Sequence, residues 1–164
     1  MARSRHNEKG SVLVEFVLGG IPVILLTLSV LQVCLCMWYY HTIEMAAAEG
    51  SRYASTKGPG CHYTTSSCAV TVAAVAARVA SASAGLQPAL LKVTLTSTAG
   101  SIICTPVTAC YSNSATWPPA SAANDSVIGV TTFYSTPVIL APFSANWIIN
   151  SVTLSANSQQ KLIF

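Results

Sequence analysis

Charged side chains are scarce in this chain of 164 residues. Asp, Glu, Lys and Arg make up 8% of it, against roughly a quarter of an average soluble domain. So little charge excludes a disordered tail and a salt-bridged helical rod, because both need many charged residues. The basic residues are also too few and too scattered to follow a phosphate backbone, so the net charge of +3 does not indicate a nucleic-acid partner. The length allows one domain with a modest core.

Catalytic motifs are lacking as well. The sequence contains no Gly-rich phosphate loop, no HExxH and no GxSxG. Asp125 is the only acidic residue after Glu49, so the later part of the chain has no carboxylate pair for acid–base chemistry. His41 and Glu44 are three residues apart, but no third metal ligand lies near them. We therefore expect no enzymatic activity, no cofactor, no metal and no small-molecule substrate.

The charge is missing most completely from one long apolar run. No Asp, Glu, Lys or Arg occurs from Phe16 to Ile43, and a helix of that length covers about 42 Å, more than the roughly 30 Å of bilayer hydrocarbon. The run ends in the cluster Trp38–Tyr39–Tyr40, whose rings suit the headgroup layer. The sequence therefore predicts a single transmembrane helix and a lipid bilayer as a partner.

The charges on either side of this run predict its orientation. Arg3, Arg5 and Lys9 precede the run, while the acidic Glu44 and Glu49 follow it. By the positive-inside rule the N-terminus lies in the cytoplasm and the C-terminal part lies outside. A secretory signal peptide has the same order of regions, but its apolar region is shorter and free of carboxylates at its start.

Glu15 stands at the start of the apolar run. An ionisable residue at the edge of a membrane span is costly, and this makes a function for it the first hypothesis. A cut between Gly10 and Ser11 exposes an ammonium near the depth of this carboxylate. Glu15 could then pair with the N-terminus of a neighbouring subunit and set the register between helices. The alternative is that Glu15 only marks the cytoplasmic edge of the membrane.

The segment around this position resembles a known family. Lys9 to Phe16 is similar to the cleavage site of type IV pilins, with a short basic leader, Gly before the cut and Glu at the fifth mature position. Val14–Leu18, then Pro22, and finally the box Ala46–Ala54 resemble the TadE-like family. Both ends of the motif match at suitable spacing, over about residues 10–54.

The resemblance implies a minor pilin or pseudopilin of a tight-adherence (Flp, type IVc) pilus system. Its partners are then a prepilin peptidase, other pilin subunits and the assembly platform of the bacterial inner membrane, with the C-terminal part periplasmic or extracellular and possibly in the pilus. The implied cleavage site is Gly10–Ser11, and Glu15 with Phe16 serves recognition or assembly. The family box contributes Glu49, Gly50 and Arg52.

Two further expectations concern the long helix itself. Pro22 interrupts the helical hydrogen-bond ladder and allows a bend. Glu49 and Arg52 are three residues apart, a spacing that brings side chains together as an exposed pair.

A second function remains open. The chain could be an uncleaved single-span membrane protein whose outer domain binds a surface ligand or serves adhesion. This reading depends on Trp117 and Trp147, which stand out in a part of the chain made mostly of small residues. Packing in the core is the more common role of such residues.

The sequence after the apolar run, residues 57–164, predicts a small α+β domain. Residues 69–85 carry Val and Ala at helical spacing, and Gly85 and Pro88 end that pattern. Strands are expected at Leu91–Thr96, Val127–Tyr134 and Trp147–Ala156. We expect one helix packed on a roughly three-stranded antiparallel sheet. The chain then divides into a leader (residues 1–10), a transmembrane and assembly helix (11–56) and an external domain (57–164).

Six cysteines fall into three close pairs. Cys34 and Cys36 lie in the apolar run, where thiols pack as small apolar groups. The pairs Cys61/Cys68 and Cys104/Cys110 lie in the outer part, where oxidation is expected. Two short-loop disulfides are the simplest pairing, and the crossed connectivities stay open.

Overall fold

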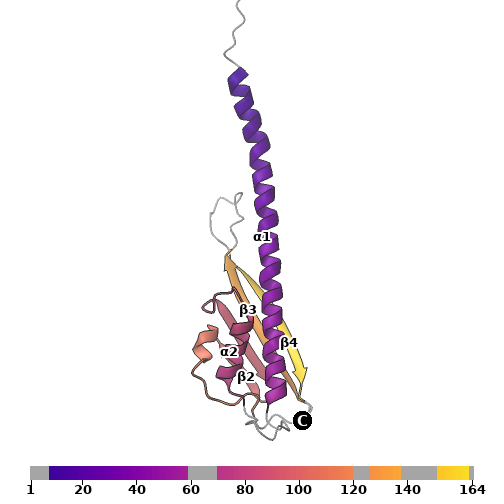
Figure 1. Ribbon diagram of the computed structural model, residues 1–164, viewed down its shortest axis with the longest axis vertical. Helices are drawn as coiled ribbons and strands as arrows, with labels where there is room; N and C mark the ends of the chain where they lie inside the picture. Colours follow the sequence, from indigo (N-terminus) through magenta and orange to yellow (C-terminus); the bar gives the residue numbers. More distant parts are fainter. Residues whose placement is uncertain (1–7, 59–69, 120–125, 138–150, 163–164) are drawn as a thin grey trace, which may run out of the picture.

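The computed structural model describes residues 8–58, 70–119, 126–137 and 151–162. A long helix, α1 (Glu8–Lys57), projects from a small domain as a rod (Figure 1). The domain contains helix α2 (Val72–Ala82), a 3₁₀ turn η1 (Val107–Cys110) and one sheet. The strands of that sheet are β1 (Leu91–Ser97), β2 (Gly100–Cys104), β3 (Val127–Pro137) and β4 (Ser151–Lys161). We call α2, η1 and the four strands the sheet domain. The mixed α+β class expected from the sequence is confirmed.

Helix α1 has two parts with different surroundings. In the free half, residues 10–37, nearly all large apolar side chains are exposed, while in the packed half, residues 38–57, one face is buried against the sheet domain. The buried positions of the packed half are spaced by three or four residues, as one face of a helix requires. They are Ile43, Ala46, Ala47, Gly50, Ser51 and Ala54. The sheet domain is therefore built around the end of α1.

Helix α2 forms where the Val and Ala spacing predicts it. Thr71 caps its start, since the hydroxyl oxygen of Thr71 accepts a hydrogen bond from the Ala74 amide at 3.2 Å. Val72, Val75, Ala76 and Val79 form its buried face. The chain turns away after Ser83, and Gly85 adopts a positive φ of 81° that suits a residue without a side chain.

The sheet has four antiparallel strands in the order β2-β1-β3-β4 rather than the roughly three that we expected. The expected strands all form, with β1 and β3 near the predicted positions. The last one, β4, begins at Ser151 and runs to Lys161, and residues 147–150 lie outside the described part. The additional strand is β2. It is short and mostly exposed, so it carries no clear alternation of apolar and polar residues.

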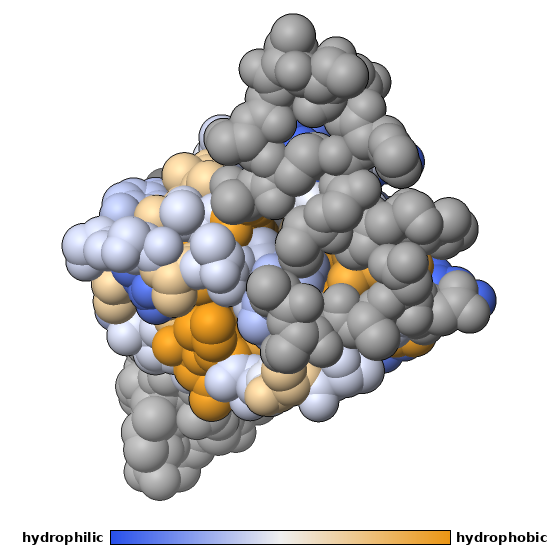
Figure 2. All heavy atoms as spheres, turned by 90° about the horizontal axis from the view of Figure 1, so that it is seen from below, coloured by the Kyte–Doolittle hydropathy of each residue, from blue (hydrophilic) through white to orange (hydrophobic). Residues whose placement is uncertain are grey.

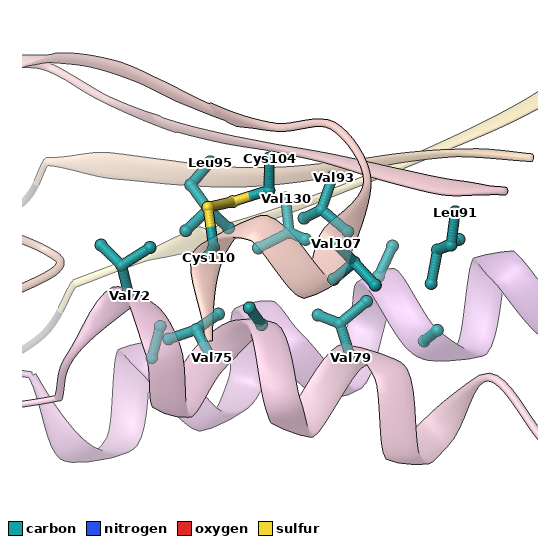
Figure 3. Packing of buried hydrophobic residues seen from close by; sticks show 14 of the residues in the cluster. Val72, Val75, Val79, Leu91, Val93, Leu95, Cys104, Val107, Cys110 and Val130 are labelled. Carbon is teal, nitrogen blue, oxygen red and sulfur yellow. A yellow bond between two sulfur atoms is a disulfide. The ribbon is translucent and has the colours of Figure 1, made fainter. Parts of the chain in front are cut away.

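The core lies between the sheet and the two helices (Figure 3). Its side chains come from both helices, η1 and the inner face of the sheet, where β1 buries every second residue from Leu91 to Leu95. Trp117 is 1% exposed, and its backbone amide donates to the Val70 carbonyl at 2.7 Å. Core packing is thus the role of Trp117. Trp147 lies outside the described residues.

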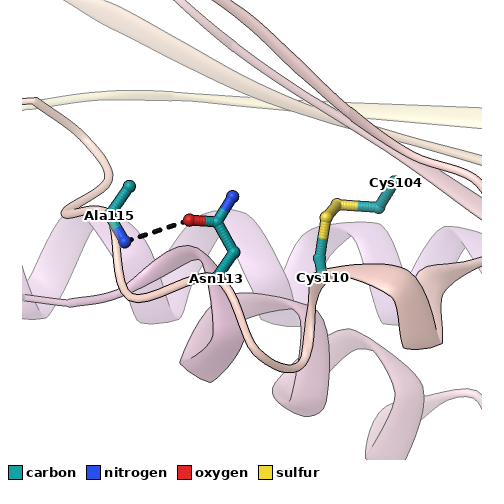
Figure 4. Close-up of a disulfide and its surroundings, with 4 residues drawn as sticks. All are labelled: Cys104, Cys110, Asn113 and Ala115. Atoms are coloured by element: carbon teal, nitrogen blue, oxygen red, sulfur yellow. Dashed lines mark hydrogen bonds between the residues drawn. A yellow bond between two sulfur atoms is a disulfide. The ribbon is translucent and has the colours of Figure 1, made fainter.

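One disulfide joins the end of β2 to η1. Cys104 and Cys110 are bonded, with their Cα atoms 5.6 Å apart (Figure 4). Both half-cystines are buried within the core cluster. This short-loop pairing excludes every crossed connectivity that uses either of these two residues. Cys61 and Cys68 lie outside the described residues.

Candidate functional site: the N-terminal helix

The free half of α1 is an uncovered apolar surface. Its most apolar window has a mean hydropathy of 2.2 and none of it is buried. Phe16 is 75% exposed and Leu18 is 71% exposed. Within the described part of the chain, α1 is the one helix long and apolar enough to cross a membrane. It is a candidate membrane anchor, because an exposed apolar surface of this size requires a bilayer or neighbouring helices.

Glu15 lies on this surface, close to the expected cleavage position. Gly10, Ser11 and Glu15 line one shallow hollow on the helix, together with Gly19. Ser11 and Glu15 are four residues apart, which places them on the same face of α1. Glu15 forms no hydrogen bond or ion pair with any described residue. Its side chain is exposed on the apolar surface of α1.

Pro22 lies inside α1, and the helix continues through it. A proline lacks the N–H that would bond to the carbonyl four residues earlier, which is that of Leu18. Five residues after Pro22 the hydroxyl of Thr27 donates to the Ile24 carbonyl at 2.8 Å, a bond within the helix. Pro22 therefore weakens the ladder at one place and leaves the rod continuous.

The aromatic cluster marks the junction between the two halves of α1. The ring of Tyr39 lies 5.5 Å from that of Tyr134 on β3. A Cβ added at Gly85 would lie 2.6 Å from the indole of Trp38, so Trp38 packs directly on the turn after α2. His41 Nδ1 lies 3.8 Å from Glu44 Oε2. No group of three His, Cys, Asp or Glu residues gathers among the described residues to hold a metal.

The family box is the surface by which α1 packs on the sheet domain. A Cβ built on Gly50 would lie 2.5 Å from Val79 Cγ2 of α2 and 3.5 Å from Val130 Cγ1 of β3. Only a glycine lets α1 come this close to both elements. The sequence resemblance marked Gly50, and the structure supplies a physical reason for it.

Two hydroxyl contacts, one buried and one partly buried, join the same interface. The hydroxyl of Thr132 on β3 donates to the Ile43 carbonyl at 3.0 Å. The hydroxyls of Ser51 and Ser158 lie 2.8 Å apart, so β4 is also joined to α1. Nothing in the sequence pointed to Thr132 or Ser158, because polar residues alternating along a strand usually face solvent.

Glu49 pairs with a different residue from the one we expected. Its Oε1 accepts hydrogen bonds from Arg78 Nη2 at 2.6 Å and from Arg78 Nε at 3.0 Å. Arg52 is exposed and forms no ion pair with Glu49, so the expected pairing was wrong. Glu49 pairs with Arg78 because α2 packs alongside α1 and places the Arg78 guanidinium next to the Glu49 carboxylate. A signal was present in the sequence, since Arg78 is the only charged residue between Lys57 and Lys92.

This ion pair gives a testable prediction. We expect the cycle of Glu49→Ala and Arg78→Ala to give a coupling energy of about 0.5 kcal/mol, because the pair is partly solvated. The side chains are 34% and 52% exposed, respectively. The cycle with Arg52→Ala in place of Arg78→Ala serves as the control and should give a smaller coupling. Thermal or denaturant unfolding of the full chain in detergent measures both. Equal coupling in the two cycles would contradict the assignment.

A known protein family matches the part of the chain that carries these features. The family model described as TadE-like protein matches residues 10–52. No curated protein and no solved structure matches this chain. The matched range runs from the expected cleavage residue Gly10, through Glu15 and the free half of α1, to the box that packs on the sheet domain. The chain thus carries a TadE-like segment, and this segment lies within helix α1.

Proposed function

We propose that this protein is a minor pilin or pseudopilin of a tight-adherence (Flp, type IVc) pilus system, and that it takes part in pilus assembly or initiation. The observation that carries the proposal is Glu15, a carboxylate without a partner among the described residues, at the start of an exposed apolar helix that matches the TadE-like family. Family membership of the segment supports pilin partners. The chain acts as a subunit and as the substrate of a peptidase, and it is not itself an enzyme.

Processing prepares the helix for assembly. A prepilin peptidase hydrolyses the bond between Gly10 and Ser11, which leaves the ammonium of Ser11 on the face of α1 that carries Glu15. Within a bilayer both charges are poorly solvated, so each favours an opposite charge on a neighbouring subunit. Pairing of the Glu15 carboxylate of one copy with the terminal ammonium of a neighbouring subunit sets the axial register between otherwise uniform apolar helices. Phe16, which is exposed beside Glu15, contributes to the same contact.

The proposed topology follows the charges around α1. The N-terminus is cytoplasmic, α1 crosses the bacterial inner membrane once, and the sheet domain is periplasmic or extracellular. Basic residues before the span support this orientation. The bonded pair Cys104–Cys110 supports it too, because disulfides persist mainly outside the cytoplasm.

The uncleaved surface-binding protein gains no support from the structure. It was based on Trp117 and Trp147 in a part of the chain made mostly of small residues, and Trp117 is buried in the core at 1% exposure. The same test cannot be applied to Trp147, which lies outside the described residues. We therefore retain the pilin proposal alone.

Co-expression with a prepilin peptidase tests the proposal. We expect mass spectrometry to find the chain without Met1–Gly10, and we expect Gly10→Ala to abolish this cleavage. Gly19→Ala is the matched control, because a Cβ at Gly19, as at Gly10, has no neighbour within 4 Å. It should be processed normally. An intact Met1 beside a peptidase that cleaves its own cognate pilin would overturn the proposal.

A further inference from the structure

We propose that the sheet domain rests on the headgroup layer of the bilayer through the turn between α2 and β1. This turn comprises residues 83–90, and we call it the α2–β1 turn. Leu90 enters the interfacial layer and Lys92 lies at the level of the lipid phosphates. The inference depends on the proposed membrane span of α1 and adds to it a second, separate contact with lipid.

The turn lies beside the aromatic cluster of α1. Its Gly85 is so close to Trp38 that an added Cβ would lie 2.6 Å from the indole ring. Tryptophan favours the boundary between hydrocarbon and headgroups. Because α1 holds Trp38 at that boundary, the α2–β1 turn lies there as well.

The turn is also rigid and fixed to the sheet. Backbone amides of Leu86, Leu90 and Leu91 donate to the carbonyls of Ser83, Gln87 and Pro88 at 3.1, 3.0 and 3.3 Å. Leu91 begins β1 and pairs with Tyr134, whose ring lies 5.5 Å from that of Tyr39. The start of β1 is therefore held against the aromatic cluster from two sides, while β3 and β4 continue beyond it to the Pro137–Ser151 pair.

The exposed side chains of the turn suit a lipid surface. No charged residue occurs between Arg78 and Lys92. Leu90 is 43% exposed although it follows directly on a structured turn. An exposed leucine on an uncharged surface beside a membrane span gains free energy by entering the interface.

Lys92 provides a positive charge at the edge of the uncharged α2–β1 turn. Its side chain is half-buried, and Nζ lies 5.4 Å from the ring centroid of Phe133. An ammonium held over an aromatic ring at the edge of an apolar surface is attracted as well to the anionic phosphates of a headgroup layer. The ring also keeps Lys92 on the sheet, close to the turn.

The opposite end of the domain has a different character. Lys57 ends α1 there, and Lys161 pairs with Val127 at the far end of the sheet. Seen from that end, the described surface mixes pale polar residues with strongly hydrophilic ones and a few apolar patches (Figure 2). Lys57 and Lys161 thus lie away from the α2–β1 turn, whose own residues are all uncharged.

Photocrosslinking of the full chain in vesicles of phosphatidylethanolamine and phosphatidylglycerol tests the inference. p-Benzoylphenylalanine replaces Leu90, Ile103 or Leu28 in three separate samples. Ile103 is the matched control, since it is an exposed apolar residue of the same domain, 60% exposed on edge strand β2. Leu28 lies in the free half of α1 and reports the span itself. Mass spectrometry identifies lipid adducts after illumination.

We expect adducts with phospholipid at positions 28 and 90, and several-fold fewer at position 103. If position 28 gives lipid adducts but position 90 gives no more than position 103, this inference is overturned. The membrane span of α1 is then still supported. Protein–protein adducts in place of lipid adducts at position 90 also overturn it. No lipid adduct at position 28 contradicts the span, and with it both proposals. Retention of the Cys104–Cys110 disulfide in each variant confirms that the domain has folded.

Discussion

Gly50→Val is expected to destabilise the sheet domain by about 3 kcal/mol, at the upper end of the usual cost of overpacking a core. Even a bare Cβ at this position would lie 2.5 Å from Val79 Cγ2, and Val79 is fully buried. The short, branched side chain of Val79 cannot move aside, so α1 must separate from α2 and β3. Thermal unfolding of the full chain in detergent, followed by circular dichroism, should show Tm lowered by on the order of 10 °C.

Ala48→Val provides the matched control for this substitution. Ala48 lies on the same turns of α1, but its side chain is exposed. We expect a change within about 0.5 kcal/mol, as is usual for surface positions. If both variants unfolded at the wild-type temperature, α1 would not pack on the domain through the family box.

Glu15→Gln is expected to reduce association with pilin subunits and the assembly platform by more than tenfold. Loss of one partner of a buried charge pair costs roughly 3–5 kcal/mol, and each 1.4 kcal/mol is a factor of ten in affinity. Glutamine keeps nearly the same shape and polarity, so the loss reports the charge. Co-purification of partners from membranes, quantified against the amount of processed chain, measures the effect.

Glu44→Gln is the control for Glu15→Gln. Glu44 is another exposed carboxylate of α1, but it lies beyond the aromatic cluster and outside the apolar run. Its substitution should leave association unchanged. Partner recovery that is equal in the two variants, with normal processing, would show that Glu15 only marks the membrane edge.

The residues of α1 and of the inner strands could be assigned from local patterns. The uncharged run from Phe16 to Ile43 predicts a helix by its length, and the Val and Ala spacing predicts α2. Strand β1 alternates from Leu91, so its period is visible. Strand β2 was missed because an edge strand is held by backbone bonds to one neighbour, here β1, and these impose little pattern on its side chains.

The candidate site likewise has residues that the sequence identifies and contacts that only the folded structure shows. Gly10, Ser11 and Glu15 could be named from the sequence because their significance lies in chemical type and spacing along one helix. The partner of Glu49 could not, since Arg52 and Arg78 are equally good donors and only the packing of α2 on α1 selects Arg78. The sequence also could not show why position 50 requires glycine, because the residues that it contacts, Val79 and Val130, are remote from it in sequence.

The sequence by itself determined the properties that depend on neighbouring residues. These are the apolar helix, the aromatic cluster at its end, the carboxylate at its start and the scarcity of charge elsewhere. The tertiary structure decided which face of α1 carries the domain, which cysteine bonds to Cys104, and that Trp117 is a core residue. It also placed Gly85 against Trp38, and so set the α2–β1 turn beside the aromatic cluster. Such contacts join segments far apart in the chain, and their free energies exist only once the chain has folded.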